Sequence, residues 1–209
     1  MSLKLIPARY KPLAWLLAVF LVVSTLTRLV LLVAAGTGVS ASVAHWLAVF
    51  GIGLGFDLLT FAYFAWPMVL LLWLMPRRWL RARRGRWPVM LLGWLLVAAV
   101  LFIAVAEWTF WEEFQTRFNF IAVDYLVYTT EVIGNIRESY PVPAILSVLF
   151  VLTTALCWWG RRWLAPRAQD DSSFGRRTLV TLGWLVVSVA GTWLVTANVK
   201  NVSDNEYVN

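Results

Sequence analysis

Five long apolar segments constrain this chain more than any other feature of its sequence. They cover about residues 12–36, 45–75, 88–106, 142–160 and 178–197. A helix needs about 20 mostly apolar residues to cross roughly 30 Å of hydrocarbon, and a helix satisfies its own backbone groups there. Only 14% of the 209 residues are charged and 61% are hydrophobic, which excludes a soluble domain. The sequence therefore predicts an all-α polytopic bundle of five transmembrane helices, with no internal repeat and no interrupted span.

The basic residues are distributed unevenly between the connections. Fourteen of the eighteen lysines and arginines lie in residues 1–11, 77–86 and 161–177, which fall on one side of a five-span protein. Cytoplasmic loops carry such an excess of Lys and Arg, so we expect a cytoplasmic N-terminus and an external C-terminus. The net charge of +7 is then a topology signal and not a nucleic-acid footprint. The first apolar run is too long for a signal peptide and contains Arg28, so we expect it to be retained.

The connection after the third span is external in this topology and has a mixed composition. Over residues 117–140 its apolar residues recur every three to four positions, which predicts an external amphipathic helix. Glu113 and Arg117 can pair four residues apart at its start. Two interpretations stay open: the helix caps the bundle with solvated acids, or it docks a lipid or a partner. The candidate docking residues are Arg117, Asn119, Asp124, Tyr128, Glu131, Asn135, Arg137 and Glu138.

Two charged residues, Arg28 and Asp57, lie inside predicted spans, where each is costly in lipid. Counted from the external side, their depths are similar, so we expect an intramembrane ion pair between the first and second spans. Such a pair either locks the two spans together or contacts a lipid head group or a substrate. Three glycines at alternate positions in 51–55 permit close packing at this level.

The residues offer no catalytic or metal constellation. One histidine, His45, and one cysteine, Cys157, cannot build the usual nucleophile–base or metal sets. We therefore expect no catalytic residue, no metal ligand and no cofactor in this chain.

Three segments resemble one known family. "RFNFIAVDYLVYTTEVIGNIRESYPV" (117–142), "GFDLLTFAYFAWP" (55–67) and "NVSDNEYVN" (201–209) are similar to the membrane half of the lipoteichoic-acid-synthase-like family. These are phosphoglycerol transferases and sulfatase-like enzymes of the alkaline phosphatase superfamily. The resemblance implies a bacterial inner-membrane protein whose five spans precede a large external catalytic domain. That domain holds a divalent metal, often manganese, and a threonine nucleophile that takes phosphoglycerol from phosphatidylglycerol.

No position of this chain corresponds to that threonine or to the metal ligands. The resemblance thus implies an anchoring and lipid-presenting role, with membrane lipids, phosphatidylglycerol among them, and a catalytic domain or separate catalytic chain as partners. Residues 198–209 are then the external start of a linker, and Ser203 followed by Glu206 fits a capping box that opens a new helix. The alternative is a self-sufficient small transporter or scaffold, in which Arg28 and Asp57 would act as a buried relay, although no interrupted span or repeat symmetry accompanies them in the sequence.

Overall fold

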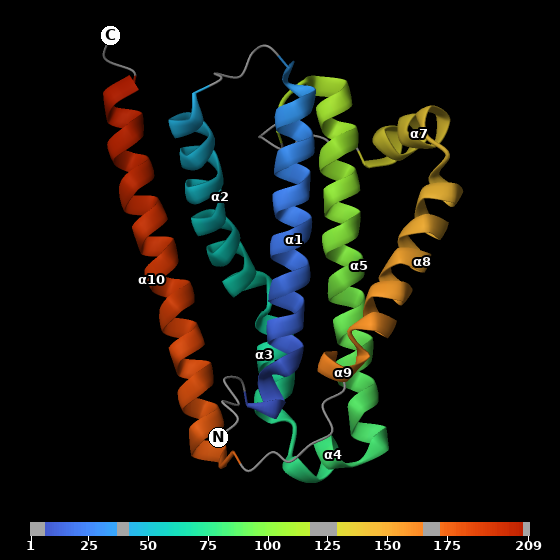
Figure 1. Cartoon of the computed structure of the whole chain (residues 1–209), viewed down its shortest axis with the longest axis vertical. Coiled ribbons are helices and arrows are strands. Elements are labelled where there is room, and N and C mark those ends of the chain that lie inside the picture. Colours follow the sequence, from blue (N-terminus) through green and yellow to red (C-terminus); the bar gives the residue numbers. More distant parts are fainter. Residues whose placement is uncertain (1–6, 37–41, 118–128, 165–171, 207–209) are drawn as a thin grey trace.

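A computed structural model describes residues 7–36, 42–117, 129–164 and 172–206 of the chain. Within them it contains no strand, and five helices are long and apolar enough to cross a membrane (Figure 1). The prediction of an all-α bundle with five membrane helices is therefore confirmed. The elements are η1 Ala8–Tyr10, α1 Lys11–Ala34, α2 Val43–Phe64, α3 Trp66–Leu74, α4 Arg77–Arg81, α5 Arg83–Phe114, α7 Thr129–Ser139, α8 Val142–Trp159, α9 Arg161–Leu164 and α10 Phe174–Glu206.

Helices α1 and α5 form the centre of the bundle. They pack against each other, α1 also packs on α2, and α5 also packs on α8, while α10 packs on α2 and α3. The buried core includes Leu16, Met68, Leu72 and Val97, which come from α1, α3 and α5. In α8 and α10 only 11% of the most apolar stretch is buried, against 28% in α5. The outer helices therefore present most of their apolar surface to lipid.

The second span is interrupted, and the prediction of one continuous span over 45–75 was wrong. Helix α2 ends at Phe64 and α3 begins at Trp66, because Pro67 has no N–H to continue the ladder of helical hydrogen bonds. The Trp184 indole of α10 donates to the Ala62 carbonyl at 2.7 Å and satisfies a group in the last turn of α2. Ala65 is 0% exposed, so the break is packed inside the bundle.

Helix α10 is held to the interrupted span by side-chain hydrogen bonds. The Tyr63 hydroxyl donates to the Ser188 carbonyl at 2.7 Å, and the Trp73 indole donates to the Thr178 hydroxyl at 3.0 Å. In lipid, such interhelical bonds contribute to association because apolar burial cannot distinguish a neighbouring helix from an acyl chain.

The last helix corrects the prediction that a new, capped helix starts at Ser203. Helix α10 continues without interruption through Glu206, so Ser203 lies inside a helix and does not cap a new one. No glycine or proline occurs between Thr192 and Glu206, and nothing in the sequence stops the helix where the hydrocarbon ends. The end of α10 lies at the same end of the bundle as α7 (Figure 1).

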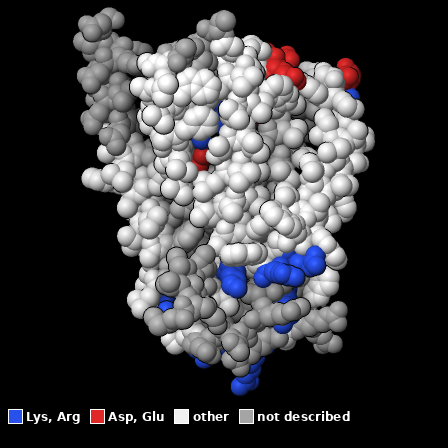
Figure 2. Space-filling view, viewed as in Figure 1, with Lys and Arg blue, Asp and Glu red and all other residues white. Residues whose placement is uncertain are grey.

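Acidic and basic side chains gather at opposite ends of the molecule. Figure 2 shows Lys and Arg at the end that carries α4 and α9, and Asp and Glu at the end that carries α7. These are called the arginine-rich end and the acidic end below.

Candidate functional site

A pocket of about 250 Å³ opens at the acidic end, between the last turns of α5 and helix α7. Its floor is mostly apolar, and the Phe110 and Phe114 rings pack there with centroids 4.6 Å apart. Glu113, Asn135 and Ser139, all exposed, add polar groups. The residues that line it are Ala106, Thr109, Phe110, Glu113, Phe114, Val132, Asn135, Ile136, Ser139 and Tyr140.

The end of α5 determines where the chain leaves the bundle. Gln115 adopts a left-handed conformation with φ 51°, and its backbone N–H donates to the Trp111 carbonyl at 2.8 Å. Its side-chain amide also donates to the carbonyls of Trp111 and Glu112, at 3.3 and 3.4 Å. A left-handed residue that bonds the last carbonyls is a common way to end a helix. The chain turns sharply at this point.

Arg117 makes a different ion pair from the one that the sequence predicts. Its Nε donates to Oε1 of Glu107 at 2.6 Å, and Glu113 instead lines the pocket. Pairing at a spacing of four requires a continuous helix, and α5 has already ended at Phe114. The Glu107 side chain is only 12% exposed, whereas that of Arg117 is 56% exposed. Arg117 is therefore folded back against α5.

The predicted external helix is present in its second half. Helix α7 places Val132, Asn135, Ile136 and Ser139 toward α5, at the spacing of one helical face. Asn135, one of the candidate docking residues, thus lines the pocket beside the apolar residues Val132 and Ile136.

The other candidate docking residues divide into two groups. Arg137 and Glu138 are exposed on α7 and do not line the pocket. Asn119, Asp124 and Tyr128 lie outside the described residues, and so does the side chain of Glu131. Sequence reasoning missed the α5 half of the pocket. The signal was Phe110 and Phe114, four residues apart, with Glu113 on the same turn.

Tyr140 connects the pocket to the acids around it. Burial raises the pKa of its hydroxyl above the ordinary value of 10.0, and the charges of Glu112 and Glu113 raise it further. The hydroxyl is therefore a neutral donor at physiological pH, in a negative local field. Among its described lining residues, the pocket offers donors from Tyr140, Asn135 and Ser139 and the carboxylate of Glu113.

A second polar feature lies within the membrane-spanning part. Arg28 of α1 donates to Oδ2 of Asp57 in α2 at 2.8 Å, and the Ser24 hydroxyl donates to Oδ1 at 2.6 Å. The side chains of Arg28 and Asp57 are 8% and 12% exposed. The ion pair that the sequence predicts between these two spans is present.

The glycines near this pair have different roles. A Cβ on Gly53 would come within 2.4 Å of the Arg28 guanidinium, whereas Gly51 and Gly55 have open space where a Cβ would lie. Only Gly53 makes room for the ion pair. Ser24 also lines a small hollow of about 80 Å³ between α1 and α5, and Glu107 lies at the same hollow.

No group of three or more His, Cys, Asp or Glu residues in the described part of the chain could hold a metal ion. The α5–α7 pocket can hydrogen-bond a small polar group that lies above its apolar floor.

No protein-family model and no solved structure matches the chain.

Proposed function

We propose that this chain is the membrane anchor and lipid-presenting part of an enzyme of the phosphoglycerol transferase or sulfatase-like class. It acts at the outer face of the bacterial inner membrane, with its N-terminus in the cytoplasm and its C-terminus outside. The observation that carries the proposal is the α5–α7 pocket at the acidic end, near the level where α10 also ends. The sequence resemblance supplies the enzyme class.

The chemistry of the pocket suits a glycerol-bearing head group. Phe110, Val132 and Ile136 offer an apolar wall to the upper part of a lipid. The Glu113 carboxylate accepts hydrogen bonds from glycerol hydroxyls, and the Asn135 amide donates to a phosphate oxygen. The catalytic nucleophile and a divalent metal, often manganese, belong in this proposal to a catalytic domain or a separate chain. The pocket would hold the lipid while that catalytic part acts on it.

A matched pair of isoleucines on α7 tests the pocket. Ile136 lines it and Ile133 does not, yet their exposed fractions are 45% and 44%. We expect Ile136→Trp to fill the pocket and to weaken phosphatidylglycerol binding by roughly tenfold, and Ile133→Trp to leave it within about twofold. Binding is measured by native mass spectrometry on the full chain in detergent, with phosphatidylcholine as the reference lipid. Equal effects of the two substitutions would remove the lipid-presenting role.

The enzyme class needs a separate assay. Membranes from cells with and without the gene are supplied with labelled phosphatidylglycerol and manganese, and release of glycerol phosphate is measured. We expect the release to fall when the gene is deleted. Unchanged release, together with intact lipid binding, would leave a lipid-binding membrane protein and reject the transferase assignment.

The interrupted second span is the observation that favours the alternative, a small transporter. In transporters, broken helices line the substrate site near the middle of the membrane. Here Ala65 and Met68 fill the break, and each is 0% exposed. Among the described residues the break is thus closely packed and not open to a substrate, so the anchor is the better proposal.

A further inference from the structure

The hollow of about 80 Å³ between α1 and α5 lies beside the intramembrane ion pair, because Ser24 takes part in both. The two helices run in the same direction (Figure 1), and each contributes lining residues up to seven positions apart. At about 1.5 Å per residue, the hollow extends about 10 Å along the bundle. Thr27 and Glu107 lie at its end toward the acidic end of the molecule. The residues that line it are Phe20, Val23, Ser24, Thr27, Val100, Ile103, Ala104 and Glu107.

The half of the hollow toward the acidic end is polar. It contains the hydroxyls of Ser24 and Thr27 and the carboxylate of Glu107. Arg117 bonds Oε1 of Glu107, and a carboxylate has about four acceptor sites, so Oε2 can still accept. The Ser24 hydroxyl gives its hydrogen to Oδ1 of Asp57, and its oxygen can still accept. A buried water molecule needs about two to four polar partners, and these side chains can supply them.

The opposite half of the hollow is apolar and closed. The Phe20 ring packs against the rings of Phe61 and Phe64, with centroids 5.6 and 5.8 Å apart. One turn further toward the arginine-rich end, Leu16 and Val97 are 2% and 0% exposed in the core between α1 and α5. In the described part of the chain, this packing closes the hollow toward the arginine-rich end.

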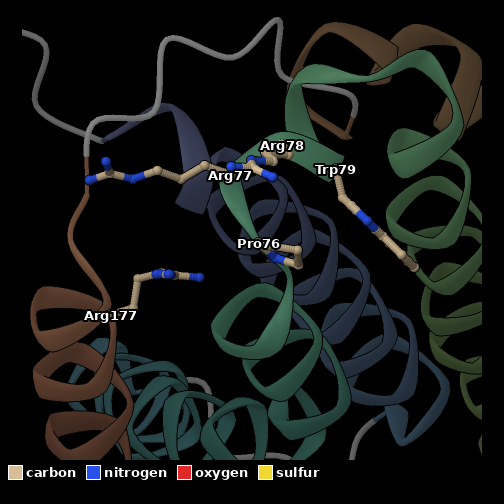
Figure 3. Close-up of a pocket in the computed structure, with 5 residues that line it drawn as sticks. All are labelled: Pro76, Arg77, Arg78, Trp79 and Arg177. Carbon is tan, nitrogen blue, oxygen red and sulfur yellow. The ribbon is translucent and has the colours of Figure 1, made fainter.

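A larger hollow, of about 650 Å³, lies beyond that core at the arginine-rich end. Figure 3 shows Arg177 pointing into it from α10. Among the described residues the two hollows share no lining residue. The core around Leu16 and Val97 therefore separates the α1–α5 hollow from water at this end of the molecule. The residues that line the larger hollow are Pro76, Arg77, Arg78, Trp79 and Arg177.

We infer that the α1–α5 hollow is a water-filled inlet that connects the Arg28–Asp57 pair to the acidic end of the molecule. A water molecule takes up about 30 Å³ in the liquid, so the hollow has room for roughly two. Waters between Glu107 and Ser24 complete a chain of hydrogen bonds that ends at Asp57. At the other end of this chain, the Arg117 side chain bonds Glu107 and is 56% exposed.

Water at this place allows the pair to keep both charges inside the membrane-spanning part. Ionised side chains within spans are tolerated where they face a water-filled cavity. Ser24 lies about 15 Å from the end of α1 at Ala34, from a rise of about 1.5 Å per residue, so the inlet carries water well below the interface. A space for roughly two waters is too small for a lipid head group. The inference does not depend on the function proposed above.

Modification of single cysteines in proteoliposomes tests the inference. Cys157 is the one cysteine of the chain, so a Cys157→Ala background leaves only the introduced thiol to react. Thr27→Cys places a thiol in the hollow. The matched control is Leu26→Cys on the adjacent residue, which does not line the hollow and is 54% exposed on the lipid-facing surface.

The reagent is methyl methanethiosulfonate, which is small and crosses membranes. It reacts with thiolates, and a thiol in apolar surroundings stays protonated. We expect Thr27→Cys to react at least about tenfold faster than Leu26→Cys, although Leu26 is the more exposed residue. Equal rates, or a faster reaction of Leu26→Cys, would mean that the hollow is dry and would overturn the inference.

Two further variants test the closed end and the volume of the hollow. Val97→Cys, in the core, should react as slowly as Leu26→Cys, and a fast reaction would overturn an inlet closed at one end. Ala104→Leu adds three carbon atoms inside the hollow and should slow the reaction of Thr27→Cys. Ala106→Leu, at the α5–α7 pocket, is the control and should leave that rate unchanged. An equal effect of the two leucines would also overturn the inference.

Hydroxyl-radical labelling of the unchanged chain in lipid nanodiscs applies where a cysteine variant does not fold. X-ray radiolysis of bound water oxidises the side chains that lie beside it. We expect Phe20, which lines the hollow, to be oxidised faster than Phe102, which does not line it and is 54% exposed toward lipid. Oxidation of Phe102 at the same rate or faster would overturn the inference.

Discussion

Removing one partner of the Arg28–Asp57 pair should destabilise the bundle far more than removing both. In Asp57→Leu, Arg28 loses its 2.8 Å hydrogen bond and Ser24 loses its 2.6 Å acceptor, at side chains that are nearly buried. Arg28 lies about 9 Å from the end of α1 at Ala34, from a rise of about 1.5 Å per residue, so its stem can partly reach the interface. We expect a loss of about 3 kcal/mol in the free energy of unfolding, the amount typical of a buried charge left without its partner.

The double variant Arg28→Leu/Asp57→Leu removes both charges and replaces them with apolar groups that lipid and protein accept. Replacing a buried ion pair in this way is often close to neutral, so we expect it to lie within about 1 kcal/mol of the unchanged chain. The measurement is equilibrium unfolding of the full chain in mixed micelles with increasing sodium dodecyl sulfate, followed by helical circular dichroism.

The two single variants and the double variant form a cycle whose coupling energy we expect to exceed about 2 kcal/mol. Purely additive losses would show that the two charges act independently, and the ion pair would then not hold α1 to α2.

Two further predictions concern the break in the second span and the acidic pocket. Trp184→Phe removes the indole donor at the break and should lower the free energy of unfolding by about 0.6–2 kcal/mol in the same assay. Trp193→Phe, at a side chain 69% exposed on the same helix, should leave that free energy unchanged. Equal effects of the two variants would contradict a stabilising role for the Trp184 hydrogen bond. The folded chain favours the neutral form of the Tyr140 hydroxyl. The contribution of this preference to the stability of the fold is therefore present below pH 10 and is lost as the pH rises through the raised pKa of Tyr140. Ultraviolet titration, with Tyr140→Phe to identify the signal, should show this pKa moving back toward 10.0 in Glu112→Gln/Glu113→Gln; an unmoved pKa would mean that the two carboxylates do not act on it.

The apolar segments were sufficient to predict the number of membrane helices, because the hydrocarbon imposes one length and one composition on each of them. The Arg28–Asp57 pair was also predictable, since its cost in lipid restricts both residues to a mutual contact at similar depth. Both predictions rest on the membrane as solvent and need no knowledge of side-chain packing.

The parts that sequence reasoning missed depend on contacts between distant segments. Pro67 is visible in the sequence, but whether a proline bends or breaks a span depends on the contacts that the helix ends make, and here the Trp184 indole from α10 donates to the Ala62 carbonyl in the last turn of α2. The α5–α7 pocket likewise depends on the left-handed conformation of Gln115, which no pattern in the sequence predicts. A pairing between Glu113 and Arg117 was expected only because the helix was assumed to continue.

The two ends of the bundle differ in how firmly they are held, and this difference suits an anchor that presents lipid. At the arginine-rich end, two buried arginines from η1 and α10 bind the carbonyls at the end of α3, and Leu80 and Leu164 are each 1% exposed. At the acidic end, the residues of α7 are partly or fully exposed where they are described, and α7 faces α5 across an open pocket. Elements with few buried contacts open at low free energy, so the proposed exchange of lipid would be easiest where the pocket lies. A firmly held base and a looser opposite end would let one bundle hold its position in the membrane while lipid enters and leaves the proposed site.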